Sequence, residues 1–184
     1  MALSPTLWRT CRVLSGTTRL SLLQRIIRSP GLCVSDLAAA EGISLGRASQ
    51  ELRRLQSRGL VRVERILRYV RYYPESDPLV ASAKPILEAM KRVVESSNRN
   101  AMDLAQKYAL GLTHPRREGI IRLLKNGPLG DSDLKAQSRM GFQSFWHHMS
   151  LLRETGWIEM EKSERRWQLR PGKSPLATCL LELV

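Results

Sequence analysis

The sequence has little of what disulfide-stabilised or membrane-spanning proteins need. It has three cysteines in 184 residues, at Cys11, Cys33 and Cys179, and no two of them form a Cys-x-x-Cys pair. An odd, scattered set of cysteines argues against a disulfide framework and for a reducing compartment. No apolar run approaches the roughly 18 residues that a membrane-spanning helix needs. We therefore expect a cytoplasmic protein with no membrane partner.

Acidic residues are scarce as well. Asp and Glu number 17 against 30 Lys and Arg, which gives a formal net charge of +13. Such an excess is typical of proteins with an anionic partner, most often nucleic acid and sometimes a membrane surface. The excess is spread over both halves of the chain and is not a basic tail. The acid-free, arginine-bearing N-terminus is also compatible with a transit peptide, but this segment fits the repeat described below.

The sequence lacks the usual signatures of catalysis and metal binding. It contains no Gly-rich phosphate loop and no catalytic arrangement of paired carboxylates. Cys33 stands at a predicted helix start, where a thiol pKa can be depressed, but the first half has no histidine to assist it. His147 and His148 are adjacent, so they point about 100° apart on a helix and cannot share one ion. We expect no enzyme activity, no metal and no cofactor.

The chain is similar to itself at an offset of 97 positions. Ser35-Asp36-Leu37 recurs as Ser132-Asp133-Leu134, and the alignment continues without gaps. Further identities pair Leu55 with Leu152, Gly59 with Gly156, Glu64 with Glu161, Arg68 with Arg165, Pro74 with Pro171, and Pro78-Leu79 with Pro175-Leu176. They fall at predicted caps, turns and core positions. We interpret this as an internal duplication, with an N-terminal domain over 1–97 and a C-terminal domain over 98–184.

Each copy predicts helices followed by a β-hairpin. The spacing of apolar residues indicates a first helix and then a second one over Thr17–Arg28. Ser35 and Ser132 are predicted N-caps of a short third helix, which in the first copy ends near Gly42. Alternating apolar residues between Val61 and Tyr72 predict a hairpin. The predicted fold class is mainly α with small β-hairpin wings (α+β), as two tandem winged helix-turn-helix domains.

The helix after Gly42 has the strongest functional pattern. Ser44 is its predicted cap, Ala48, Leu52 and Leu55 form its buried stripe, and Gly59 supplies a left-handed stop. A helix of this kind can enter the major groove of DNA, and the hairpin tip can reach neighbouring phosphates or the minor groove. The predicted DNA-binding residues of the helix and the tip are Ser44, Arg47, Ser49, Gln50, Arg53, Arg54, Arg58, Arg65 and Arg68. A merely solvated charged face is the alternative, although such faces usually mix signs and this one has a single acid, Glu51.

Residues Leu14–Tyr73 resemble the ArsR-type winged helix-turn-helix of bacterial transcription regulators. The resemblance rests on Arg19 at the start of the second helix, the segments "VSDLA", "ASQEL" and "LQSRGLV", and a basic hairpin that ends in tyrosines. Apolar residues at helical spacing from Pro78 towards Ser97 predict a long fifth helix. The resemblance implies a DNA-binding repressor in which the first and fifth helices form a dimer. Two positions depart from the family. Metal-sensing members often carry Cys-x-Cys where this chain has Cys33-x-Ser35, and a histidine is common at the position of Glu51.

The second copy keeps the pattern but not the charge. Its equivalent helix places Phe142, Phe145, Trp146, Met149 and Leu152 on or beside the core stripe and leaves Gln143, Ser144, His147 and Ser150 facing outwards. We expect a degenerate winged helix that reads DNA weakly or serves pairing or effector binding. The tryptophans of this half are predicted to fill its core, with a ligand pocket or base stacking as the alternative.

Two assemblies and two functions remain open from the sequence. Two chains can form a homodimer through Leu7–Leu14 and Leu79–Val94, which we favour, or the two copies can form an intramolecular pseudo-dimer. The favoured function is a sequence-specific regulator that binds double-stranded DNA and acts as a repressor. The alternative is a structural or assembly protein that uses tandem winged helices for protein contacts and has non-specific nucleic-acid affinity.

Overall fold

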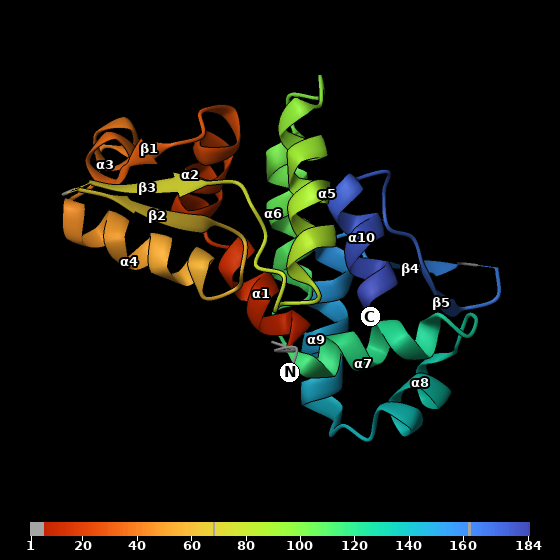
Figure 1. Ribbon diagram of the computed structural model, residues 1–184. Helices are drawn as coiled ribbons and strands as arrows, with labels where there is room; N and C mark the ends of the chain where they lie inside the picture. The colour runs from red at the N-terminus through yellow and green to blue at the C-terminus, as the bar shows by residue number, and fades with distance from the viewer. Residues whose placement is uncertain (1–5, 68, 162) are drawn as a thin grey trace.

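The computed structural model describes residues 6–67, 69–161 and 163–184. These residues form ten α-helices and five β-strands, and the strands make two small antiparallel sheets (Figure 1). The predicted mainly helical α+β composition is therefore confirmed. None of the helices formed by the described residues is long and apolar enough to cross a membrane.

The first half of the chain contains helices α1 to α5 and a three-stranded sheet. In chain order these are α1 (Leu7–Leu14), α2 (Thr17–Arg28), β1 (Leu32–Cys33), α3 (Val34–Glu41), α4 (Leu45–Gln56), β2 (Arg62–Ile66), β3 (Tyr69–Tyr73) and α5 (Ala83–Glu95). β3 lies between β1 and β2. The helices α2, α3 and α4 enclose a core in which Leu23, Leu37 and Leu52 are completely buried.

The second half repeats this order of elements. It contains α6 (Ala101–Gly111), α7 (Pro115–Leu124), α8 (Asp131–Ser138), α9 (Phe142–Glu154), β4 (Ile158–Glu161), β5 (Arg166–Leu169) and α10 (Pro175–Leu183). An isolated bridge between Leu129 and Trp167 stands where β1 pairs with β3 in the first half. Trp157 and Trp167 are buried, as expected of core residues, and Trp146 is half-buried.

The helix ends follow the sequence in part. Ser44 caps α4, since its hydroxyl accepts a hydrogen bond from the N–H of Arg47 at 3.3 Å. Gly42 and Gly59 take the left-handed conformation, with φ of 62° and 68°. The caps predicted at Ser35 and Ser132 are wrong, because α3 begins at Val34 and α8 at Asp131. In α3 the carboxylate of Asp36 accepts the N–H of Cys33 at 3.0 Å, so the helix starts before Ser35.

The hairpins show that the ungapped self-alignment fails beyond α4 and α9. Leu32 pairs with Tyr72, and its counterpart Leu129 pairs with Trp167, two residues earlier than an offset of 97 requires. The second hairpin is therefore the shorter one. Pro78 and Pro175 are consequently not equivalent, since Pro175 begins α10 whereas Pro78 lies in the turn before α5.

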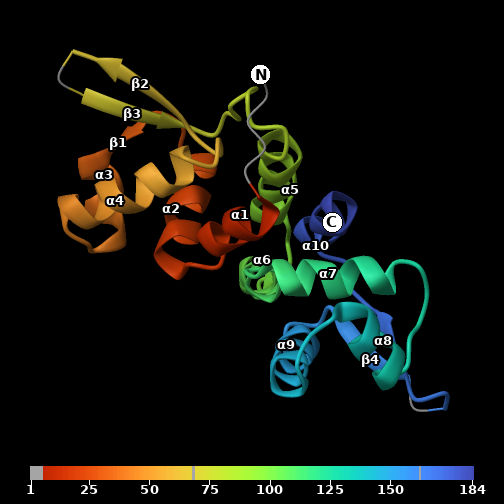
Figure 2. The same cartoon turned by 90° about the horizontal axis from the view of Figure 1, so that it is seen from below.

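The two halves pack through their first and last helices. α1 lies against α6, and α5 lies against both α10 and α6 (Figures 1 and 2). The amide of Gln106 on α6 donates to the carbonyl of Ser15 and to the hydroxyl of Thr17, both at 3.0 Å. On α5, the side chains of Ile86, Leu87, Ala89, Met90 and Val93 are at most 1% exposed within the single chain.

This packing does not favour the expected homodimer through Leu7–Leu14 and Leu79–Val94, which stays a prediction. Most of the apolar side chains that were to meet a second chain are covered by α6 and α10 of the same chain, although Leu79 remains exposed. A homodimer through these helices would have to displace that packing. Pairing of the two halves within one chain satisfies the same surfaces.

Two glycines of the second half predict opposite effects on stability. At Gly111 an added Cβ would lie 2.4 Å from Cδ1 of Trp157, a buried residue whose indole donates to the carbonyl of Tyr108 at 3.0 Å. We expect Gly111→Ala to lower the free energy of unfolding by about 1–3 kcal/mol through overpacking. Gly119, within α7, has open space around the added Cβ, so Gly119→Ala should raise it by about 0.5–1 kcal/mol. Urea titration of both variants measures this, and equal effects would contradict the packing around Trp157.

Candidate nucleic-acid interface

Helix α4 presents a polar outer face above a completely buried stripe. Ala48, Leu52 and Leu55 are each 0% exposed, as predicted from their spacing. Of the predicted contact residues on this helix, Ser44, Arg47, Gln50, Arg53 and Arg54 are exposed, and Ser49 is half-buried. The structure therefore brings most of the predicted helix residues to one solvent-facing surface.

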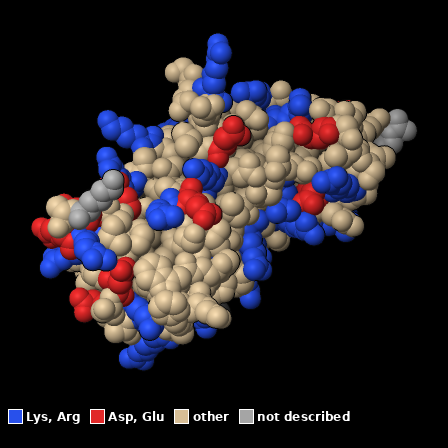
Figure 3. Space-filling view, turned by 180° about the vertical axis from the view of Figure 1, so that it is seen from behind, with Lys and Arg blue, Asp and Glu red and all other residues tan. Residues whose placement is uncertain are grey.

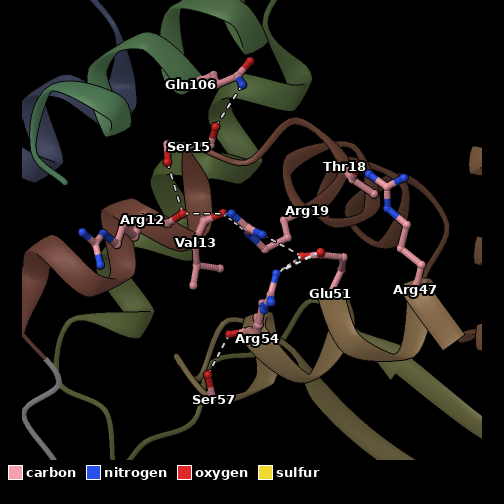
Figure 4. Close-up of polar contacts among 10 residues, drawn as sticks. All are labelled: Arg12, Val13, Ser15, Thr18, Arg19, Arg47, Glu51, Arg54, Ser57 and Gln106. Atoms are coloured by element: carbon pink, nitrogen blue, oxygen red, sulfur yellow. Dashed lines mark hydrogen bonds and ion pairs between the residues drawn. The ribbon is translucent and has the colours of Figure 1, made fainter.

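An ion-pair network fixes α4 against α1 and α2 (Figure 4). The guanidinium of Arg19, on α2, donates to the carboxylate of Glu51 on α4 at 2.7 Å. The same guanidinium donates to the carbonyls of Val13 at 2.7 Å and Arg12 at 3.1 Å, near the C-terminal end of α1. One side chain thus satisfies carbonyls that the end of α1 leaves without helical partners and also holds the middle of α4.

Glu51 also binds Arg54, with N–O distances of 3.0 and 3.2 Å. Burial raises the pKa of the Glu51 carboxyl, but the hydrogen bonds and charges of Arg19 and Arg54 outweigh burial and leave the pKa below its ordinary value. Arg54 is therefore a partly neutralised cation. Two other arginines of α4, Arg47 and Arg53, are exposed and make no ion pair with the described residues. Arg47 makes one long hydrogen bond, 3.3 Å, to the hydroxyl of Thr18.

Arg58 differs from its predicted role. Its side chain is half-buried, and its Nε is enclosed without a hydrogen-bond partner among the described residues. A guanidinium in this position is poorly placed to reach a phosphate without moving. The role of Arg58 in DNA contact remains a prediction that its burial does not favour.

The β2–β3 hairpin, the wing, carries further cations, and the sequence predicted only some of them. Arg65 is exposed on β2, whereas Arg68 lies outside the described residues. Two further arginines were not predicted. Arg62 binds Glu75 at 2.6 Å and stacks on the ring of Tyr73 at 4.6 Å, and Arg71 donates to the carbonyl of Gly31 at 2.8 Å. Both arginines alternate with apolar residues along their strands, and this alternation could have predicted that they lie on the outer face of the wing.

Basic side chains are numerous on one face of the molecule. Figure 3 shows Lys and Arg side chains scattered over this face, with Asp and Glu side chains among them. This distribution agrees with the net charge of +13. The basic side chains are thus spread over this face and do not form one isolated patch.

Helix α9, the counterpart of α4, lacks comparable charge. Phe145, Met149 and Leu152 are buried as predicted, but the placement of Phe142 beside the core is wrong, since its side chain is 64% exposed. It lies at the first turn, where Lys135 stands over its ring at 5.3 Å. Ser144 accepts a hydrogen bond from Arg116 at 2.7 Å.

His148 occupies the position in α9 that Glu51 occupies in α4. Its ring is 6% exposed and lies 4.7 Å, centroid to centroid, from the ring of His114. Burial lowers the pKa of His148 to about 4, and the neighbouring His114 and Arg117 act in the same direction. The second half therefore replaces the carboxylate of the first half with a neutral imidazole beside cations.

The described residues contain no group of three or more His, Cys, Asp and Glu side chains that could hold a metal ion. Cys33 contacts polar neighbours instead, with its Sγ 2.9 Å from the hydroxyl of Ser35 and 3.0 Å from the carboxylate of Asp36. These contacts belong to the start of α3. Cys11 and Cys179 are buried, and burial raises the pKa of both thiols.

The ion pair predicts a large effect of Glu51. Glu51→Gln leaves the part-buried Arg19 without its anionic partner, so the free energy of unfolding should fall by about 1–3 kcal/mol. Since the folded pKa lies below the ordinary 4.5, this contribution is present above that pH and is lost as the pH falls below it. The control is Glu88→Gln, which breaks the more exposed pair with Lys91 and should change stability by less than about 0.5 kcal/mol. Equal losses in the two variants would contradict an anchoring role of Glu51.

His148 predicts a second pH dependence. The unfolded chain binds a proton near the ordinary pKa of 6.5, whereas the folded chain does so only near 4. Unfolding therefore takes up a proton between these values, and stability should fall as the pH is lowered through that range. Thermal melts of wild type and His148→Gln between pH 7 and pH 4 test this. A slope that is unchanged in His148→Gln would show that another group is responsible.

Comparison with known proteins agrees with the geometry of the first half. Residues 17–62, about a quarter of the chain, match the model of a family described as winged helix-turn-helix DNA-binding. The match begins at α2 and ends at the start of β2, so it covers the ion-pair network and α4. No curated protein matches the chain. The segment 17–62 is thus similar to winged helix-turn-helix domains that bind DNA.

Proposed function

We propose that this protein is a sequence-specific, double-stranded DNA-binding transcriptional regulator that acts as a repressor of the ArsR type. The observation that carries the proposal is the outer face of α4. It exposes Arg47, Gln50 and Arg53 on a helix that Arg19 and Glu51 hold in a fixed orientation. Arg and Gln are side chains that read guanine and adenine edges in the major groove.

The fixed orientation matters for sequence reading. A hydrogen bond to a base edge needs a donor placed within a few tenths of an ångström, and a helix free to roll about its axis cannot offer that. The network joins the middle of α4 to α2 and to the end of α1 through Arg19. The exposed residues of α4 are therefore presented by a rigid scaffold.

We further propose that the chain is a tandem pair of winged helices, with domains over 1–97 and 98–184, arranged as an intramolecular pseudo-dimer. Support comes from the repeated element order and from the packing of α1 and α5 against α6 and α10. In Figure 2, α4 is seen from the side whereas α9 is seen end-on, so the two helices do not run in the same direction. When α4 lies in a groove of a duplex, α9 therefore cannot lie in a groove of the same duplex in the same orientation. This favours α4 as the helix that makes most of the base contacts.

A second candidate function is supported by α9. Its exposed end carries Phe142, 64% exposed, and its outer positions Gln143 and His147 offer little charge for phosphates. These features suit a contact with another protein better than a contact with DNA. On this alternative the protein is an assembly component, and its nucleic-acid affinity is non-specific.

Selection of bound duplexes from a random library decides between the two functions. A regulator should enrich one sequence motif, whereas an assembly protein should enrich none. On the enriched duplex, Arg47→Ala with Gln50→Ala should relax base preference and weaken binding by about 1–3 kcal/mol for each base that is no longer hydrogen-bonded. Arg65→Ala should weaken binding to all sequences and lower the salt slope by about 0.9.

The control for these variants is Arg99→Ala. Arg99 is exposed in the segment between α5 and α6, away from α4 and the wing, and should leave both affinity and preference unchanged. If the Arg47/Gln50 double variant selects the same motif as the wild type with the same affinity, α4 is not the reader.

A further inference from the structure

The tip of the wing exposes apolar side chains to solvent. Leu67 is 96% exposed, Ile66 is 42% exposed, and Tyr69, which pairs with Ile66 in the hairpin, is 43% exposed. No other large apolar side chain that the structure describes is as exposed as Leu67. An apolar residue at the end of an otherwise basic hairpin requires an explanation.

Folding of the hairpin does not explain Leu67. Its backbone φ is +55°, a left-handed conformation that disfavours residues with a Cβ. Tight hairpin turns with positive φ favour Asn, Asp and Gly at such positions. Asn here would relieve the backbone strain and would also be compatible with water. An exposed leucine on a hairpin also raises the tendency to associate edge to edge. Leu67 therefore lowers stability and solubility, and no contact with the described residues compensates for this.

The charges around the tip indicate what Leu67 meets. Arg65 and Arg71 are exposed on the two strands behind the tip. One acid, Glu64, lies opposite Arg71 in the hairpin and pairs with Arg62 at 3.6 Å. An apolar point with cations behind it complements a groove whose floor is formed by stacked bases and whose edges are phosphates. A hydrophobic protein pocket would not need the arginines.

The position of the tip agrees with that occupant. In both ribbon views the tip of the β2–β3 hairpin lies at the same end of the molecule as the N-terminal turn of α4 (Figures 1 and 2). When that turn enters a major groove, the wing projects along the same duplex. The minor groove next to it is then within reach of the hairpin.

We propose that Leu67, supported by Ile66, is an apolar wedge that enters the minor groove, partly unstacks one base step and bends the duplex. The proposal rests on the proposed DNA-binding function. Apolar side chains inserted in this way kink DNA towards the major groove. Because pyrimidine–purine steps unstack most easily, the wedge also selects such a step at a base pair to which it donates no hydrogen bond.

The experiment uses the full chain and its selected duplex, with 2-aminopurine placed at successive steps and bending measured by circular permutation. Wild type should raise the 2-aminopurine fluorescence at one step and bend the duplex. Leu67→Asn should remove both effects and lower affinity about tenfold, while its thermal stability stays equal or rises, because Asn tolerates positive φ. Leu67→Met should retain the bend.

The matched control is Leu79→Asn, since Leu79 is 53% exposed in the turn before α5 and should have no effect on the DNA. A wild-type complex with straight DNA, or a Leu67→Asn complex that bends DNA as wild type does, would overturn the wedge while leaving the regulator function intact. If no motif is selected from the random library, that result overturns the proposed regulator function, and the wedge proposal, which rests on it, is overturned as well.

Two other occupants are distinguished by parallel measurements on the same variants. Binding of wild type, but not of Leu67→Asn, to phosphatidylserine vesicles with unchanged DNA bending would assign the tip to a lipid surface. Self-association in sedimentation that Leu67→Asn abolishes, again with unchanged bending, would assign it to a second copy of this chain. Either result overturns the wedge.

Discussion

The contact between Arg19 and Glu51 is the interaction on which the orientation of the exposed face of α4 depends. Apolar packing of Ala48, Leu52 and Leu55 holds α4 to the core, but hydrophobic contact is non-directional and leaves rotation of the helix weakly determined. The ion pair adds direction, because the guanidinium must satisfy the carboxylate of α4 and two carbonyls of α1 together. It also uses Glu51 to neutralise part of the charge of Arg54, so the helix presents fewer free cations than its sequence contains.

The second half shows the same scaffold without this interaction. His148 replaces the carboxylate, Arg116 turns to the hydroxyl of Ser144, and the surroundings of the imidazole are cationic. Protonation of this imidazole is therefore disfavoured, and its pKa lies well below the ordinary value. The halves therefore differ at equivalent positions: the first orients a charged helix through an ion pair, and the second packs an aromatic helix around a buried histidine.

The packing of the halves relates this asymmetry to assembly. Helices α1 and α5 cover α6 and α10 within one chain, so the apolar faces that family resemblance assigns to a dimer are satisfied internally. On the proposal that the two halves form an intramolecular pseudo-dimer, the chain is not bound by the symmetry of two identical subunits. The outer positions of α9 then carry little charge, while α6 and α10 cover the helices of the first half.

The sequence by itself determined the local features: the helices, the cap at Ser44, the left-handed glycines Gly42 and Gly59, and the buried stripe of α4. These follow from spacing and from backbone preferences that act within a few residues. Only the tertiary structure decided that Arg54 is paired, that Arg58 is half-buried, that the second hairpin is shorter and that α1 and α5 are covered. Each of these depends on residues distant in the chain, such as Arg19 for Glu51 and Arg54, or α10 for α5, and no local pattern records which distant partner a side chain will meet.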